Sequence, residues 1–448
     1  MASRSGLRQC GWLLLLSMLS SAAFAQVEQW VARYTGPVRS AQALAIAVDG
    51  KGNSYVTGWS EGVGTGDDYA TVKYDSDGNE VWVARYDGPA HRDDTSLAVA
   101  VDSEGNVYVT GGSNGLGTLD DYATIKYDRD GNELWVARYD GPGHRDDIAQ
   151  AIAVDAEGHV YVTGVSYGGY SQDYATIKYD ADGTPLWVER YSGGLPPGGG
   201  ATRVCLDNEG NVYVTGGVWM GPPRYGDIGT LKYNSEGQLL WAAFYNGPGS
   251  ATDAALDLRV DSEGYVYLTG GSQWLTTLAM NYVTIKYDSE GNEVWVVLYE
   301  GPAHVNDVAY ALAIDVEGNV YVTGGSYGLG TGADYATIKY DRDGNELWVS
   351  RYDGPAHRDD VGSALVLDSE SNVYVTGWSY GIGTELDYAT VKYDGDGNEV
   401  WVTRYDGPAH QNDSARAMAI DPKGNVYVTG HSPSLSTMDY ATVKYSPK

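Results

Sequence analysis

The sequence predicts an all-β protein, an eight-bladed β-propeller whose blades are four-stranded antiparallel sheets. The tetrapeptide Tyr-Val-Thr-Gly, once Tyr-Leu-Thr-Gly, recurs eight times between Tyr55 and Tyr427. No long segment has the spacing of apolar residues that is typical of a helix. One tryptophan recurs in step, 52 to 54 residues apart: Trp30, Trp82, Trp135, Trp187, Trp241, Trp295, Trp348 and Trp401. A fixed period of this length is typical of stacked or ring-closed units rather than of independent domains.

The first 25 residues differ from the repeats and have the features of a secretory signal peptide. Arg4 and Arg8 precede an apolar run from Gly11 to Leu19, and residues 23–25 fit the small-residue cleavage pattern. The run is too short to anchor the chain across a bilayer. We therefore expect a secreted or periplasmic protein without a membrane span, in which residues 26–448 form a single propeller domain.

The chain is strongly acidic, with 29 basic and 60 acidic residues and a formal net charge of −31. The predicted signal peptide contains two arginines and no acid, so its removal makes the charge more negative. This charge argues against nucleic acid and anionic membrane surfaces as partners. It is compatible with cations, with neutral or basic ligands, or with solubility alone. Cys205 is the single cysteine after residue 25, so the sequence excludes a disulfide within the mature chain.

Each repeat contains four segments with the composition of β-strands, illustrated by the third repeat. Residues 151–154 are a short apolar run, and residues 160–163 and 174–179 are rich in aromatic and β-branched residues. Residues 186–191 carry the repeated tryptophan. Alanine alternates with larger residues in the first segment, as in residues 43–48, so we place this strand at the crowded centre. The tryptophan strand suits the broad outer edge.

Two connections in each repeat have the composition of tight hairpin turns, and the ends of the chain favour a closed ring. In residues 102–106 and 128–132, an aspartate opens the turn and a glycine accepts a positive φ. The chain after residue 25 starts on an outer-type strand, residues 30–34, and finishes on a third-type strand, residues 440–445. An N-terminal strand that completes the last blade leaves no unpaired edge. The alternative, an open solenoid, usually needs atypical capping repeats.

The repeat resembles that of a known family. Asp-Xaa-Glu-Gly-Asn-Val-Tyr-Val-Thr-Gly followed by Asp-Tyr-Ala-Thr-Ile-Lys-Tyr-Asp is similar to the SBBP-type β-propeller repeat of exported bacterial proteins, over about residues 27–446. The resemblance implies a propeller fold and an extracytoplasmic location. The family has no general catalytic signature, so the resemblance implies no active site.

Eleven tyrosines and tryptophans after residue 25 stand outside the repeat pattern, and nine of them lie in, or at the start of, the loops between second and third strands. These loops share one face of the predicted ring, where exposed aromatic side chains suit stacking on sugar rings or gripping a peptide. The alternative is that several of them pack between neighbouring loops. The predicted ligand-binding residues are Trp59, Tyr167, Tyr170, Trp219, Tyr225, Trp274, Tyr327, Trp378 and Tyr380.

The repeat loses its regularity in one sector. Residues 192–200 replace the usual crossing sequence, residues 218–227 depart most from the consensus, and residues 273–281 carry Trp274 and Met280. We predict that these three segments form one side of the binding surface. Sequence drift within a degenerate repeat is the alternative.

The crossings from an outer strand to the next inner strand contain a second pattern. In five of them a histidine follows Gly-Pro-Ala or Gly-Pro-Gly, and an aspartate follows three residues later. A ring of carboxylates at the mouth of the channel suits a hard cation such as Ca²⁺. The alternative is that each aspartate caps its own loop backbone. The candidate metal ligands are Asp94, Asp147, Asp307, Asp360 and Asp413.

No catalytic constellation stands out from the repeated sequence. We therefore predict a monomeric, non-catalytic exported propeller that binds a polysaccharide, a peptide or a protein partner through its loops, with no cofactor unless it is Ca²⁺. A structural or interaction scaffold at the cell envelope is the alternative. Residues 131–135 are also similar to the tryptophan-docking repeat of eight-bladed quinoproteins. That likeness implies a minor alternative, a quinoprotein-like oxidoreductase, although the chain has no adjacent cysteine pair.

Overall fold

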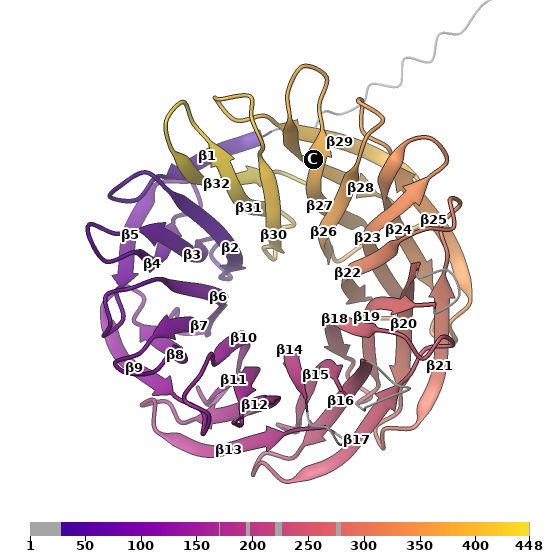
Figure 1. Cartoon of the computed structure of the whole chain (residues 1–448). Coiled ribbons are helices and arrows are strands. Elements are labelled where there is room, and N and C mark those ends of the chain that lie inside the picture. The colour runs from indigo at the N-terminus through magenta and orange to yellow at the C-terminus, as the bar shows by residue number, and fades with distance from the viewer. Residues whose placement is uncertain (1–27, 170, 194–197, 220–225, 275–278, 448) are drawn as a thin grey trace, which may run out of the picture.

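The computed structural model describes residues 28–169, 171–193, 198–219, 226–274 and 279–447, and all regular elements in these ranges are β-strands. Their 32 strands form eight four-stranded antiparallel sheets, arranged as blades around a central channel (Figure 1). The predicted fold class, an eight-bladed β-propeller, is confirmed. Blades 1 to 7 each take four consecutive strands, starting with β2–β5, and blade 8 combines β30–β32 with β1.

The first strand of each blade lies nearest the centre of the ring, and the second strand pairs with it (Figure 1). The inner strands are β2 (Ala41–Val48), β6 (Asp94–Val101), β10 (Ile148–Val154), β14 (Gly199–Leu206), β18 (Asp253–Val260), β22 (Asp307–Ile314), β26 (Asp360–Leu367) and β30 (Ser414–Ile420). The second strands are β3 (Ser54–Glu61), β7 (Val107–Asn114), β11 (Val160–Tyr167), β15 (Val212–Val218), β19 (Val266–Gln273), β23 (Val320–Gly328), β27 (Val373–Tyr380) and β31 (Val426–Pro433).

The third strands are almost wholly buried, because neighbouring blades cover both of their faces, and the outer strands carry the repeated tryptophan. The third strands are β4 (Asp67–Tyr74), β8 (Asp120–Tyr127), β12 (Gln172–Tyr179), β16 (Asp227–Tyr233), β20 (Met280–Tyr287), β24 (Gly332–Tyr340), β28 (Leu386–Tyr393) and β32 (Met438–Tyr445). The outer strands are β5 (Glu80–Tyr86), β9 (Glu133–Tyr139), β13 (Pro185–Tyr191), β17 (Leu239–Tyr245), β21 (Glu293–Tyr299), β25 (Glu346–Tyr352), β29 (Glu399–Tyr405) and β1 (Glu28–Tyr34).

The ring closes through β1, the first strand of the described chain, which is the outer strand of blade 8. β1 pairs antiparallel with β32, so that Ala32 lies opposite Thr442. The Arg33 guanidinium donates to Asp439 Oδ2 at 2.8 Å and to the hydroxyl of Tyr405, in blade 7, at 2.6 Å. The predicted closure is therefore confirmed, and β1 is tied to two blades.

Hydrogen bonds as well as apolar contacts join neighbouring blades. The Tyr69 side chain is fully buried, and its hydroxyl donates to the carbonyl of Ala123 in the next blade at 3.2 Å. Tyr440 makes the same bond to Ala70 at 2.9 Å and so joins blade 8 to blade 1. A buried phenol keeps its hydrogen bond while burying a large apolar ring. The repeat therefore specifies the junction between blades as well as the blade.

Each inner strand contains a β-bulge at the same place, a feature that the sequence analysis did not foresee. The register of β2 against β3 shifts between Ala43 and Ala45, so Leu44 has no direct partner. Leu44 lines the central channel together with its counterpart in blade 8, Arg416. A bulge bends the strand and re-aims a side chain, and here it supplies a ring of channel-lining positions.

Candidate functional site

The connections of each blade separate onto two faces of the ring. Tight turns join first to second and third to fourth strands on one face, which we call the turn face. The loops between second and third strands and the crossings between blades lie on the opposite face, which we call the loop face. The backbone N–H of Asp67, at the end of one such loop, donates to Asp93 Oδ1 in the neighbouring crossing at 3.1 Å. The two kinds of connection on the loop face are therefore in contact.

One groove on the loop face brings together two of the predicted aromatic residues. A cavity of about 700 Å³ lies where blades 3, 4 and 5 meet, and Tyr167 and Trp219 line it. The N–H of Trp219 donates to the carbonyl of Gly198 at 2.7 Å, and the N–H of Tyr167 donates to Asp147 Oδ1 at 2.9 Å. Hydrogen bonds therefore fix the main chain at both aromatic residues.

Glycine forms much of the remaining wall of this groove. The glycines concerned are Gly198, Gly199, Gly200, Gly217 and Gly226. Because these residues have no side chains, the main chain itself forms this part of the wall. The Gln172 side chain also lines the groove and donates to the Tyr167 hydroxyl at 3.1 Å. A groove that offers aromatic faces beside amide groups can stack on a ring and hydrogen-bond its substituents.

The groove contains parts of two of the three irregular segments. Residues 198–200 and residues 217–219 and 226 line it, whereas Trp274 does not. Trp274 follows β19 in blade 5 and is 38% exposed. Tyr170 and Tyr225 lie outside the described residues.

The other predicted aromatic residues are distributed over blades 1, 6 and 7, at the loop-face ends of second strands. Trp59 is half-buried in β3, and Tyr327 of β23 is 37% exposed. Trp378 and Tyr380 of β27 form an edge-to-face pair with ring centroids 6.4 Å apart. The Arg358 guanidinium covers the Tyr380 ring at 3.6 Å from its centroid. These four therefore share the face of the groove but not the groove itself.

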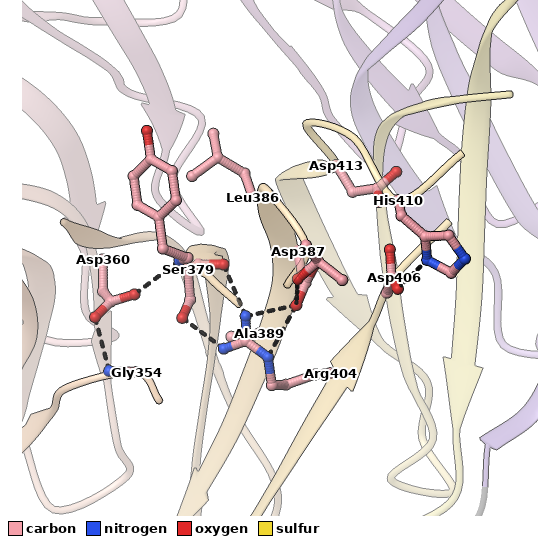
Figure 2. Close-up of polar contacts among 12 residues, drawn as sticks. Gly354, Asp360, Ser379, Leu386, Asp387, Ala389, Arg404, Asp406, His410 and Asp413 are labelled. Carbon is pink, nitrogen blue, oxygen red and sulfur yellow. Dashed lines mark hydrogen bonds and ion pairs between the residues drawn. The ribbon is translucent and has the colours of Figure 1, made fainter. Parts of the chain in front are cut away.

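The five predicted aspartates are buried in the crossings rather than exposed around the channel mouth. Asp360 Oδ2 accepts the N–H of Gly354 at 2.7 Å, and its Oδ1 accepts the N–H of Tyr380 at 3.1 Å (Figure 2). All five are at most 1% exposed. Burial raises the pKa of Asp360 to about 6, against hydrogen bonds from Ser379 and Gly354. Each of the five thus accepts a glycine N–H from its own crossing with one carboxylate oxygen.

Four of these five aspartates also lie next to two other carboxylates, which the sequence analysis did not group with them. The triads, each with ligand atoms within 4.8 Å of one another, are Asp68, Asp87 and Asp94; Asp121, Asp140 and Asp147; Asp334, Asp353 and Asp360; and Asp387, Asp406 and Asp413. Asp307 has no such triad among the described residues, because Asn281 and Glu300 occupy the equivalent positions. Figure 2 shows the last triad.

The channel contains charged residues that the sequence analysis missed. Arg203 of β14 and Asp257 of β18 stand at the position that alanine occupies in the inner strands of the other six blades. Arg259 Nη1 donates to Asp257 Oδ1 at 2.7 Å, and these residues line one cavity with Arg416. The loss of the repeated alanine in blades 4 and 5 could have revealed these charged residues from the sequence. The same two blades contribute to the groove.

Exposed aliphatic residues at the tips of five loops are a second feature that sorting by aromatic type missed. They belong to the consecutive blades 6, 7, 8, 1 and 2, which complement the groove sector. They are Leu329, Ile382, Leu435, Val63 and Leu116, each at least 77% exposed. We call these five loop tips the aliphatic sector. The same blades also carry Trp59, Tyr327, Trp378 and Tyr380, so aliphatic and aromatic side chains share this part of the loop face.

Comparison with protein-family models identifies the repeat. The model described as "Beta-propeller repeat", SBBP, matches residues 29–63, 86–117 and 400–434. The chain carries SBBP β-propeller repeats. The resemblance predicted from the sequence is thus confirmed, and two of the matched SBBP segments flank the point of ring closure.

A curated relative of this SBBP-repeat chain is the uncharacterized WD repeat-containing protein L264 of Acanthamoeba polyphaga mimivirus. The two are 22% identical over 458 aligned residues, which cover 80% of this chain and 31% of the relative. The chain therefore spans about a third of the length of that relative. Within the described ranges, we find no helix long and apolar enough to cross a membrane.

Several solved structures are similar to the SBBP-repeat ring at low identity. One is a eukaryotic initiation factor, with TM-score 0.47 and 10% identity, covering 88% of this chain and 82% of that one. A mitotic checkpoint complex chain has TM-score 0.46 and 8% identity, covering 100% and 98%. The polysaccharide lyase Uly1 has TM-score 0.43 and 11% identity, covering 90% of both. Identities this low say nothing about a shared activity.

Proposed function

We propose that this SBBP-repeat protein is an exported, non-catalytic binding protein that holds a polysaccharide or peptide ligand in the groove of blades 3 to 5. One observation carries the proposal: Tyr167 and Trp219, from different blades, line a single cavity of about 700 Å³ with a glycine-rich wall. A cavity of this size suits a short stretch of a sugar or peptide chain. Loops on a rigid scaffold are the usual place for such a site.

The charge of the protein narrows the ligand class. The chain has 60 acidic and 29 basic residues, so an anionic polymer approaches against a repulsive field. The groove itself contributes one carboxylate, Asp253, which is 2% exposed. Neutral or basic chains are therefore the favoured ligands.

The test is binding of the chain from residue 26 onward to panels of neutral, basic and acidic polysaccharides and of peptides. We expect a ligand whose affinity falls at least tenfold in Trp219→Ala, because loss of a stacked aromatic anchor costs about 1.4 kcal/mol or more. Trp274→Ala is the matched control, since Trp274 is exposed on the same face outside the groove. Equal affinity of Trp219→Ala and wild type for every ligand found would contradict the placement.

A second candidate function, a protein-interaction scaffold, is favoured by the aliphatic sector. Five loop tips that are each at least 77% exposed present apolar side chains from adjacent blades on one face, and exposed apolar groups gathered on one surface are typical of contact sites. Its test measures the affinity of a captured protein partner for the wild type and for the triple variant Leu116→Ser, Leu329→Ser, Ile382→Ser. A partner that binds both proteins equally would argue against this sector as its site.

A further inference from the structure

We infer that the four aspartate triads of the loop face are binding sites for a divalent cation, with Ca²⁺ as the best-fitting ion. Each triad joins two blades, because two of its members come from one blade and the third lies at the start of the inner strand of the next, or directly before it. The junctions are 1–2, 2–3, 6–7 and 7–8. The sites are separate from the groove proposed above, and each is built by the repeat itself.

The triad at the junction of blades 7 and 8 shows how the carboxylates are oriented (Figure 2). Asp387 Oδ2 pairs with Arg404 Nη2 at 2.7 Å, Asp406 Oδ2 lies 2.5 Å from His410 Nδ1, and Asp413 Oδ2 accepts the N–H of Gly407 at 2.7 Å. Each carboxylate therefore uses one oxygen for a partner outside the triad.

The remaining oxygens of two carboxylates in each triad are buried and have no hydrogen-bond partner. In this triad they are Asp387 Oδ1 and Asp406 Oδ1, and the Asp387 residue is 4% exposed. The corresponding atoms in the other triads are Oδ1 of Asp68, Asp87, Asp121, Asp140, Asp334 and Asp353. Buried carboxylate oxygens without a partner are costly, and a cation that they ligate removes this cost.

Asp413 gives a second indication at the same junction. In the three other triads a backbone N–H from the second strand reaches Oδ1 of the equivalent aspartate, as Tyr380 does for Asp360. Pro433 stands at that position in blade 8 and has no N–H, so Asp413 Oδ1 lacks the main-chain hydrogen bond that its counterparts accept. Asp413 is fully buried, so all three carboxylates of this triad offer an oxygen.

Ca²⁺ suits these sites better than Mg²⁺ because it accepts irregular oxygen coordination, whereas Mg²⁺ demands near-octahedral geometry. Ligand atoms on opposite sides of Ca²⁺ lie up to about 5 Å apart, because Ca–O distances are about 2.3–2.6 Å, whereas Mg²⁺ spans only about 4.2 Å. The triad atoms lie within 4.8 Å of one another, a spacing that one Ca²⁺ can bridge. Three carboxylates beside one arginine also leave a net negative site.

Four junctions of the ring lack a complete triad and provide internal controls. At the junction of blades 5 and 6, Glu300 takes the place of Asp406 and lies 3.1 Å from His304. Asn281 stands there at the position that corresponds to Asp387. Thr35 and Ala41 replace two of the three aspartates where blade 8 meets blade 1. The sequence thus predicts about four ions per chain rather than eight.

The test is isothermal titration of the chelator-treated chain from residue 26 with CaCl₂ and with MgCl₂, together with metal analysis after dialysis. We expect about four Ca²⁺ ions with dissociation constants between about 10 µM and 1 mM, and weaker binding of Mg²⁺. Asp406→Asn should lower the number to three while leaving the fold intact, since its outer partner is the exposed His410. Glu300→Gln should leave it at four.

Two results would overturn the inference. One is the absence of Ca²⁺ binding up to about 10 mM in a protein whose circular dichroism shows the native sheet content. The other is an unchanged ion number in Asp406→Asn, which would place the bound ions on the general acidic surface. Thermal unfolding with Ca²⁺ and with EDTA gives a second readout, and equal midpoints would likewise count against the sites.

Discussion

At the scale of single residues, the loop face is held by arginines that each bind several partners at once. Arg404 Nη1 donates to Ser379 Oγ at 2.5 Å and to the Tyr352 hydroxyl, in the neighbouring blade, at 2.9 Å, while Nη2 pairs with Asp387. The planar guanidinium suits this role because it offers five donors in a fixed geometry. The same arrangement recurs at Arg33, Arg85, Arg138, Arg190 and Arg351. Strand ends on this face are therefore rigid, as a preformed site requires.

His431 makes the stability of the folded protein depend on pH. It lies in β31, with Nδ1 3.0 Å from Gln42 Nε2. Burial, with the positive charge of Arg416, lowers the pKa of His431 to about 4. An unfolded histidine has a pKa near 6.5, so the unfolded chain binds the proton first. The stability due to neutral His431 is complete above pH 6.5 and is lost as the pH falls to 4.

We therefore expect His431→Gln to be less sensitive to acid than the wild type. The difference between the two free energies of unfolding should change by about 2–3 kcal/mol between pH 7 and pH 4. Urea unfolding of both proteins at several pH values measures it, and the comparison cancels the buried aspartates, which titrate in both. Parallel pH profiles would show that His431 is already hydrated or charged in the folded protein.

At the scale of the element, the turn between third and outer strands packs against the tryptophan of the preceding blade. Gly397 has φ +83°, and a Cβ built on it lies 2.6 Å from the Trp348 ring. Trp348 Nε1 donates to the carbonyl of Gly395, in the same turn, at 3.1 Å. The same turn therefore forms the hairpin of its own blade and packs that blade against the preceding one.

Gly397→Ala should destabilise the protein by about 2 kcal/mol, because it adds both left-handed backbone strain and overlap with the indole. Gly395→Ala is the matched control in the same turn, since a Cβ there meets nothing within 4 Å and the backbone φ is not in the left-handed region. Chemical denaturation of the two variants measures the difference. Equal stabilities would mean that the turn moves away from Trp348 at no cost.

The sequence predicts the strands and turns well because each rests on local chemistry. The aromatic and β-branched residues of 160–163 and the glycine in residues 128–132 are signals that a short window contains. The groove is different, because Tyr167 and Trp219 meet only when blades 3 and 4 are placed side by side. The partner of Tyr380 is equally non-local, because Arg358 lies in the preceding crossing. Its cation–π contact covers the Tyr380 ring, which the sequence alone had suggested was open to a ligand.

At the scale of the whole molecule, stability depends on closure of the ring by β1. Without β1, the buried strand β32 becomes an exposed edge, and Asp439 loses its pairing with Arg33. An exposed edge strand invites pairing with another chain. The same ring has no disulfide to hold it, since Cys205 is its one cysteine after residue 25.

A chain that starts at residue 35 should therefore unfold at a lower temperature than one that starts at residue 28, and it should self-associate. Thermal scanning and sedimentation velocity on the two proteins test this expectation. A shortened chain that stays monomeric with an unchanged melting temperature would show that blade 8 is complete with three strands. Adding a peptide of residues 26–34 should restore the midpoint if the strand itself is the missing part.

This closure also determines when the ring can form relative to synthesis of the chain. Within the propeller, β1 is synthesised before every other strand, and its partner β32 is synthesised after them. The hydrogen bonds between them cannot form until synthesis of the domain has finished, however early the blades in between acquire their sheets. The nascent protein is therefore an open arc with two unpaired edges throughout elongation. A protein built this way depends on passing quickly, or under the protection of a chaperone, through the interval before its two ends meet.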